Sequence, residues 1–358
     1  MKLPIIINEA GKIYIEAVPQ LAWGKNKECT FVGALEAALA VTATPYTYES
    51  MMGWSGLAFR ARWYHGDTDR RWCPSSPVGE SPEEIGLLRQ AIGWELPIES
   101  QIDKPQCTMA EFASTIAREI RAGRPVLAYE PQLNVAVIYG FENEGSILLL
   151  RDYMNDEQQS RMPIDKIGPF LCFLGTHKEP INPHEALVRG INQGVDNWHR
   201  SHAPANDGRY WMGRAALLKW REDLQHIDSV DTELRKLLFF VSWWTFDSLA
   251  DARTAANRFL RRNAECFHGS QHRHLMQAAA LYSEEASLLR SFMSDKQAFL
   301  GPWTGKGFEH WTPATRLREV TIINQLLGLE TEAMGQLENM LDAAQVSMSA
   351  AGGSLASG

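Results

Sequence analysis

The chain has 358 residues, of which 45% are hydrophobic and 22% are charged, and its formal net charge is −8 at pH 7. This composition is typical of a globular protein, and the length favours two domains. The negative charge argues against a nucleic-acid partner, because neutralising phosphates requires clustered Lys and Arg. No apolar run reaches the roughly 18 residues that a membrane span needs, and the first apolar stretch is too short for a signal peptide. We therefore expect a cytoplasmic protein without a membrane partner.

The cysteines indicate neither a disulfide framework nor a zinc site. They are odd in number, widely spaced and without a C-x-x-C pair, at positions Cys29, Cys73, Cys107, Cys172 and Cys266. This usage fits a reducing compartment. Three histidines near Cys266 (His268, His272 and His274) lack the spacing of zinc ligands. We predict no cofactor and no metal.

The first half of the chain mixes helix and strand patterns. A hairpin is predicted around Gly11, and helices are predicted after Cys29, Ser81 and Thr108. Ser81 and Thr108 are each followed three residues later by glutamate, which is the pattern of a capping box. Apolar, β-branched stretches that predict strands follow at 125–129, 135–141, 147–150 and 170–174. Helices first and an antiparallel sheet afterwards predict an α+β domain.

The second half carries helix patterns only. From Asn182 onward the apolar spacing predicts helices at about 183–201, 209–226, 231–246, 248–267, 271–294 and 312–344. We therefore predict an all-α helical bundle over residues 179–346, in which no strand is expected. The segment 347–358 is rich in Ser, Ala and Gly and is predicted to be a disordered tail.

Two glutamates of the predicted bundle, Glu285 and Glu330, fall on apolar helix faces. Inward carboxylates on facing helices can bind a pair of metal ions, but such sites also need Glu-x-x-His motifs, which neither helix has. Buried ion pairing with Arg253, Arg258 or Arg316 is the better interpretation.

Cys29 lies at the start of the first long helix pattern. The apolar face of this helix is formed by Phe31, Ala34, Leu35, Ala38 and Leu39. Pro45 ends the pattern, because the residue before a proline is pushed out of helical geometry. A thiol in the first turn of a helix is stabilised as a thiolate by the helix dipole. Cys29 is therefore either a nucleophile, partly reachable from a cleft, or a buried structural cysteine.

Three stretches, in this order, resemble the papain-like cysteine-peptidase superfamily. They are Cys29 followed by Met51–Arg60, then Gly123–Leu127, then Asn134–Glu142 continuing to Asp152. The resemblance covers roughly residues 1 to 175 and is closest to the branch of bacteriocin-processing peptidases and the N-terminal domain of butirosin biosynthesis protein H, an acyltransferase. A helical C-terminal domain also occurs in this branch. The resemblance implies a papain-like α+β domain over residues 1–178, ahead of the bundle.

The resemblance also implies a nucleophile, a base and a residue that orients the base. Cys29 matches the nucleophile and Asp152 the orienting residue, but Asn134 occupies the position of the histidine base. Asparagine cannot take up a proton at neutral pH. Gln20 matches the side-chain donor that stabilises the oxyanion, and Asn26 is a second candidate.

Three interpretations of Asn134 remain open. The domain has kept the fold and lost the chemistry, or His65 or His177 reaches Cys29 from another element, or the alignment is shifted. We hypothesise a cysteine-dependent acyl-group hydrolase or transferase of peptide or secondary metabolism. Its substrate would be a small-molecule, peptide or carrier-bound acyl compound. The competing hypothesis is a catalytically inactive binding or scaffold protein with the same fold.

Overall fold

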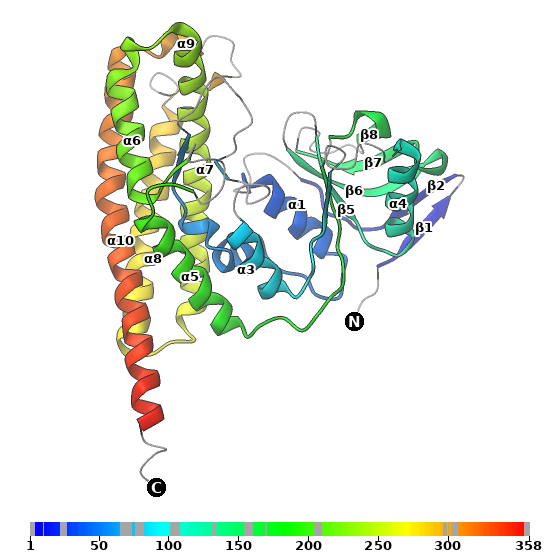
Figure 1. The fold of residues 1–358 in the computed structure, drawn as a ribbon, viewed down its shortest axis with the longest axis horizontal. Coiled ribbons are helices and arrows are strands. Elements are labelled where there is room, and N and C mark those ends of the chain that lie inside the picture. Colours follow the sequence, from blue (N-terminus) through cyan, green and yellow to red (C-terminus); the bar gives the residue numbers. More distant parts are fainter. Residues whose placement is uncertain are drawn as a thin grey trace. The chain divides into compact units, whose positions relative to one another are not determined.

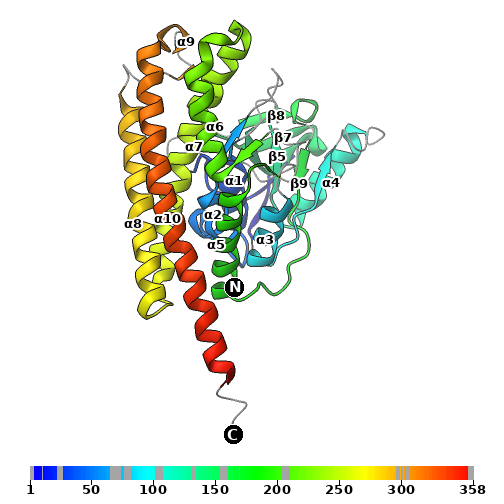
Figure 2. The same ribbon diagram turned by 60° about the vertical axis from the view of Figure 1, so that its left-hand side comes forward.

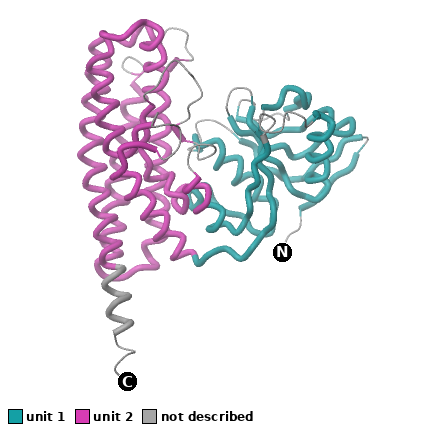
Figure 3. The backbone as a smooth tube through the Cα atoms, in the orientation of Figure 1, with its two compact units in different colours: residues 1–51, 88–182 teal, residues 52–87, 183–358 magenta. Residues whose placement is uncertain are grey.

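The computed structural model describes residues 4–9, 11–21, 27–64, 74–75, 82–100, 108–130, 134–153, 160–168, 170–203, 210–295, 299, 301–302 and 307–353. The chain divides into two compact units (Figure 3). Unit 1 comprises Met1–Met51 and Leu88–Asn182, and unit 2 comprises Met52–Leu87 and Pro183–Gly358. The division after Asn182 lies close to the predicted boundary at 178. The sequence did not predict that Met52–Leu87 would join the second unit.

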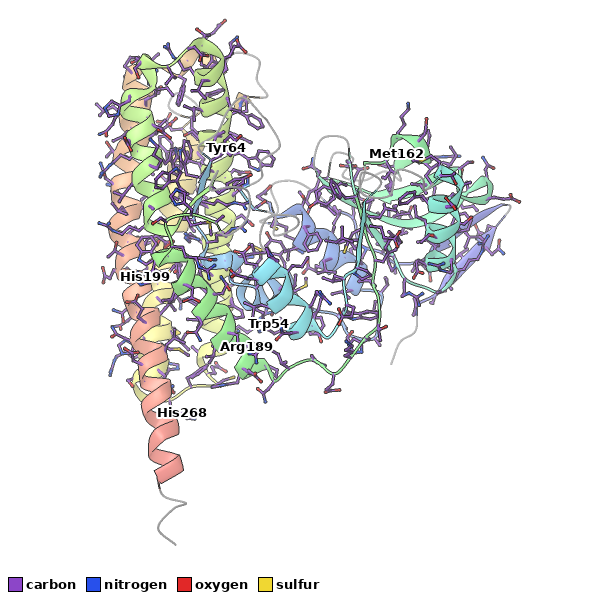
Figure 4. All side chains as sticks on the ribbon, viewed as in Figure 1. Trp54, Tyr64, Met162, Arg189, His199 and His268 are labelled. Carbon is purple, nitrogen blue, oxygen red and sulfur yellow. The ribbon has the colours of Figure 1, made fainter. Side chains whose placement is uncertain are left out.

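Unit 1 contains an antiparallel sheet. Its strands are β1 (Ile6–Glu9), β2 (Lys12–Ile15), β4 (Ile98–Ser100), β5 (Val126–Tyr129), β6 (Val135–Glu142), β7 (Ile147–Arg151), β8 (Ser160–Pro163) and β9 (Phe170–Cys172). The order β1-β2-β6-β5-β9-β4 runs across the sheet, and β7 pairs with both β6 and β8. The hairpin around Gly11 and the four strand patterns between residues 125 and 174 are confirmed. The short strands β4 and β8 were not predicted, because neither has an apolar alternation; Figure 4 labels Met162 on β8.

Two helices of unit 1 pack on this sheet. Helix α1 (Thr30–Leu39) contacts β5 and β6, and α4 (Met109–Arg121) packs on the opposite face (Figures 1 and 2). The capping box predicted for α4 is present, because Thr108 Oγ1 accepts from the Glu111 N–H and the Glu111 carboxylate accepts from the Thr108 N–H. With a helix on each face, β6 is buried along nearly its whole length.

Unit 2 is mainly helical. Its helices are α5 (Pro183–His199), α6 (Gly213–His226), α7 (Thr232–Ala264), α8 (Gly269–Ser294), α9 (Gly307–His310) and α10 (Pro313–Gly353). Helices α2 (Tyr48–Trp54) and α3 (Pro82–Ile92) cross the unit boundaries in sequence. Helix α8 packs against both α7 and α10 (Figures 1 and 2). None of the helices in the described residues is both long enough and apolar enough to span a bilayer.

Three features of unit 2 differ from the expectations. A short strand, β10 (Tyr210–Met212), pairs antiparallel with β3 (Arg62–Tyr64), so the region 183–346 is not free of strand. Helix α7 is continuous where two helices were predicted, because no glycine or proline interrupts Thr232–Ala264. Helix α10 continues to Gly353 and therefore includes the first residues of the segment predicted to be disordered.

Long-range contacts place Met52–Leu87 in unit 2. The Arg253 guanidinium on α7 donates hydrogen bonds to the carbonyl oxygens of Ala58 and Arg60, at 2.9 and 3.2 Å. Gly190 on α5 lies so close to the Gly53 carbonyl oxygen that a methyl group at position 190 would overlap it. These partners lie more than a hundred residues away in the sequence, and a local pattern does not reveal them.

Candidate active site

Cys29 occupies the N-cap position of α1, as the sequence predicts. Its N–H donates to the Tyr48 hydroxyl at 3.0 Å, and its carbonyl oxygen accepts from the Gly33 N–H at 2.9 Å. The expectation that Cys29 is partly reachable from a cleft is wrong for this conformation, because the residue is 0% exposed. Tyr48 and Tyr153, which pack around the helix start, are themselves buried, at 0% and 1% exposure. The Cys29 thiol can reach a substrate only if the residues that bury it move.

A hydrogen bond joins the start of α1 to the start of β6. The Thr30 hydroxyl oxygen accepts from the Val135 N–H at 3.2 Å. Thr30 and Val135 directly follow Cys29 and Asn134, so this bond brings the backbones of the two predicted site residues together. Asn134 is buried, with 9% of its surface exposed.

The hairpin of β5 and β6 brings a further acidic residue to this position. The Glu130 N–H donates to the Asn134 carbonyl oxygen at 2.8 Å, which continues the strand ladder by one step. In the neighbouring pair, Val137 lies opposite Arg151, so the next step places Ala136 opposite Asp152. Because side chains alternate along a strand, Glu130, Asn134 and Asp152 fall on one face of the sheet. We call these three residues the strand-end cluster.

The strand-end cluster contains a carboxyl group that titrates near neutral pH. Burial of Glu130, and secondarily the nearby Asp152 carboxylate, raise the pKa of Glu130 to about 7. Glu130 and Asp152 are 9% and 2% exposed. A carboxyl group with this pKa can accept a proton and return it at physiological pH. The sequence analysis did not identify Glu130. Its position at the end of a predicted strand, four residues before Asn134, is typical of a hairpin and could have indicated that the two residues lie side by side.

Gln20 lies beside the end of β7. Its Nε2 donates to the Asp152 carbonyl oxygen at 3.2 Å, and its Oε1 accepts from Arg151 Nη1 at 3.3 Å. The predicted oxyanion role needs an N–H donor, and the first bond already uses one of the two N–H groups of the Gln20 amide. Gln20 is thus brought to Asp152, and its contribution to an oxyanion site stays a prediction.

The other candidate residues do not supply a histidine base in the described structure. His177 forms an isolated β-bridge with Trp94, and the two rings pack with their centroids 4.9 Å apart. His65 and Asn26 lie outside the described residues, as do Cys73 and Cys107. Burial raises the pKa of the Cys172 thiol to about 12, which makes it a poor nucleophile.

A cleft of ≈ 310 Å³ opens along one face of α1. Its lining residues are Pro19, Gln20, Leu21, Lys27, Gly33, Glu36, Ala37, Ala40, Tyr46 and Tyr153. Positions 33, 37 and 40 follow Cys29 by four, eight and eleven residues, so they lie on the helix face that continues from Cys29. We call this feature the α1 cleft.

Tyr153 lines the α1 cleft beside the first turn of α1. Its hydroxyl donates to the Lys27 carbonyl oxygen at 3.2 Å. The same hydroxyl lies where a methyl group at Gly33 would be, so only glycine leaves it room. The ring therefore lies between the cleft and the first turn of α1.

Comparisons with known proteins add no assignment. No protein-family model matches the chain, and the curated proteins contain no match to it. Within the described residues, no group of three or more His, Cys, Asp or Glu side chains is arranged to hold a metal ion. The membership in the papain-like superfamily therefore stays a prediction from the motifs.

Proposed function

We propose that unit 1 is a cysteine-dependent acyl-transfer enzyme, a hydrolase or transferase, in which Cys29 is the nucleophile and Glu130 accepts its proton. The observation that carries the proposal is the Thr30–Val135 hydrogen bond, which joins the Cys29 helix to the strand end bearing Glu130 and Asn134. The pKa of Glu130, about 7, suits a group that exchanges protons at neutral pH.

The chemistry favours a thioester over a peptide. As the Cys29 sulfur attacks the acyl carbon, the thiol proton passes to Glu130 and the bond to the leaving sulfur breaks. The leaving thiolate then takes the proton from Glu130, and water or an amine later removes the acyl group from Cys29. An amine leaving group must be protonated before it departs, whereas a thiolate can leave without a proton, so a thioester makes the smaller demand on the proton donor. Asn134 donates a hydrogen bond to the acyl oxygen or the thiolate.

The test offers the purified chain acyl thioesters of N-acetylcysteamine and, separately, a peptide library. We expect release of N-acetylcysteamine, measured by chromatography, and very slow peptide cleavage. Release should vanish in Cys29→Ala and persist in Cys266→Ala, the matched control at an exposed cysteine of unit 2. Glu130→Gln should lower the rate about a hundredfold and remove the rise of rate with pH near neutrality.

One observation favours the second candidate function, a binding protein without catalysis: Cys29 is fully buried. No turnover of either substrate by a folded chain would support that function. Rapid peptide cleavage that depends on Cys29 and survives Glu130→Gln would show that another residue is the base.

A further inference from the structure

We propose that the α1 cleft binds the acyl group of the substrate, and that this group is uncharged and largely apolar. The apolar, uncharged character follows from the lining of the cleft. The identification of its occupant as an acyl group rests on the proposed function.

Small residues on α1 create the space. Gly33, Ala37 and Ala40 lie on one face of the helix and leave a groove, which Pro19 and Leu21 border as apolar residues of the preceding segment. The volume of ≈ 310 Å³ lies at the lower end of the range of about 300–1,000 Å³ for small-molecule pockets. It is about twice the ~150 Å³ of an engineered apolar cavity that holds benzene. A short acyl chain or a single ring therefore fits.

The charges in the lining are matched to each other. Lys27 and Glu36 form an ion pair, and the Glu36 carboxylate also accepts from the Tyr48 N–H at 3.0 Å. Burial and the Glu179 carboxylate raise the pKa of the Tyr46 hydroxyl, so this group is neutral at physiological pH. Among the described lining residues, a charged ligand would therefore lose water without gaining a counterion, whereas an apolar group has no such cost.

The cleft also has a direction. Its helix face leads back to Cys29, and Tyr153 stands at that end. An acyl chain lying along Gly33, Ala37 and Ala40 would present its carbonyl end to Tyr153 and the first turn of α1. Displacement of the Tyr153 ring would then bring the carbonyl carbon to the buried thiol.

Binding is tested with amide analogues of the thioesters, which do not react with Cys29. The hexanoyl compound, N-(2-acetamidoethyl)hexanamide, is compared by calorimetry with the succinoyl analogue, which carries a carboxylate. We expect the wild-type chain to prefer the hexanoyl compound. Ala37→Leu and Ala40→Leu fill the cleft from a buried and an exposed position and should each weaken binding about tenfold or more. Ala280→Leu, at an exposed position on α8, is the matched control and should bind as wild type does.

The proposal is overturned if the wild-type chain does not bind the hexanoyl compound, if it prefers the succinoyl compound, or if both filling variants bind it normally. Ala40→Leu changes an exposed side chain, so it keeps the test valid where Ala37→Leu fails to fold. Failure of the proposed function has a different signature. Binding that is lost on filling the cleft, in a chain without Cys29-dependent turnover, supports the cleft as a ligand site and contradicts acyl transfer.

Discussion

Each unit buries a pair of carboxyl groups, and the two pairs are balanced differently. In unit 2, Arg253 Nε donates to Glu285 at 3.2 Å, and the same guanidinium forms an ion pair with Glu330. All three side chains are 1% exposed. In unit 1, Glu130 lies near the Asp152 carboxylate, whose charge contributes to its raised pKa. The sequence analysis predicted buried pairing of these glutamates with Arg253, Arg258 or Arg316, and in the structure Arg253 is the partner.

The difference separates a structural cluster from a reactive one. Burial and the Glu330 carboxylate raise the pKa of Glu285 well above its usual value, while Arg253 lowers it. Burial also raises the pKa of Glu330, and Arg253 lowers it. We hypothesise that the two glutamates share one proton and carry one negative charge, which the arginine neutralises. For Glu130, both causes raise the pKa, and the resulting value of about 7 makes proton exchange easy at physiological pH.

The largest effect is expected from breaking the cluster of Arg253, Glu285 and Glu330 in unit 2, which we call the balanced cluster. Arg253→Met keeps most of the side-chain volume and removes the charge, which leaves two buried carboxyl groups and the carbonyls of Ala58 and Arg60 without their donor. Removing one partner of a buried ion pair costs roughly 3–5 kcal/mol. Urea unfolding followed by far-ultraviolet circular dichroism measures this loss.

The control for that variant is Arg258→Met, which changes an exposed arginine on the same helix. Its free energy of unfolding should stay within about 0.5 kcal/mol of wild type. Equal stabilities of the two variants would show that the buried cluster in unit 2 contributes nothing to the fold.

A smaller effect, with a pH signature, is expected in the strand-end cluster. The pKa of Glu130 is about 7 in the folded chain, against an ordinary value of 4.5, so the folded state holds this proton more tightly than the unfolded state. The contribution of Glu130 to stability is full below pH 4.5 and is lost as the pH rises through 7. Glu130→Gln cannot lose a proton, so its stability relative to wild type should increase by roughly 2–3 kcal/mol between pH 4 and pH 8.

Glu16→Gln, at an exposed position of unit 1, is the control for this pH series and should follow the wild-type curve. Parallel curves for wild type and Glu130→Gln would mean that Glu130 is an ordinary carboxylate. The proposal that Glu130 accepts the proton of Cys29 would then lose its support.

Local signals predicted much of this structure. The capping box of Thr108 and Glu111 and the position of Cys29 at a helix start each depend on a few neighbouring residues. The pairing of β3 with β10 could not be predicted in this way, because the two strands are far apart in the sequence and each has three residues. Such a short strand is stabilised by its partner and carries almost no pattern of its own.

The same limit applies to the candidate site. Nothing near Cys29 indicates that Tyr153 closes over the first turn of its helix, and the sequence therefore predicted an accessible thiol. The raised pKa of Glu130 likewise depends on burial and on Asp152, which follows two strands later. Residue types and helix starts follow from local sequence, whereas burial and pKa follow from partners brought together by the fold.

The smallest effect is expected from Glu285→Gln, which tests whether the balanced cluster holds one proton. Since Glu285 is the carboxyl group with the strongly raised pKa, a neutral glutamine of the same shape should cost no more than about 1 kcal/mol at pH 7. The double variant Glu285→Gln/Glu330→Gln leaves the Arg253 charge buried without a carboxylate and should cost about 3 kcal/mol or more. In Glu330→Gln alone, Glu285 can lose its proton and take over the pairing, so each single loss is small and the two are not additive. Additive losses in a double-mutant cycle, measured by urea unfolding, would mean that the two glutamates do not share a proton. The positive charge of Arg253 would then be neutralised in another way.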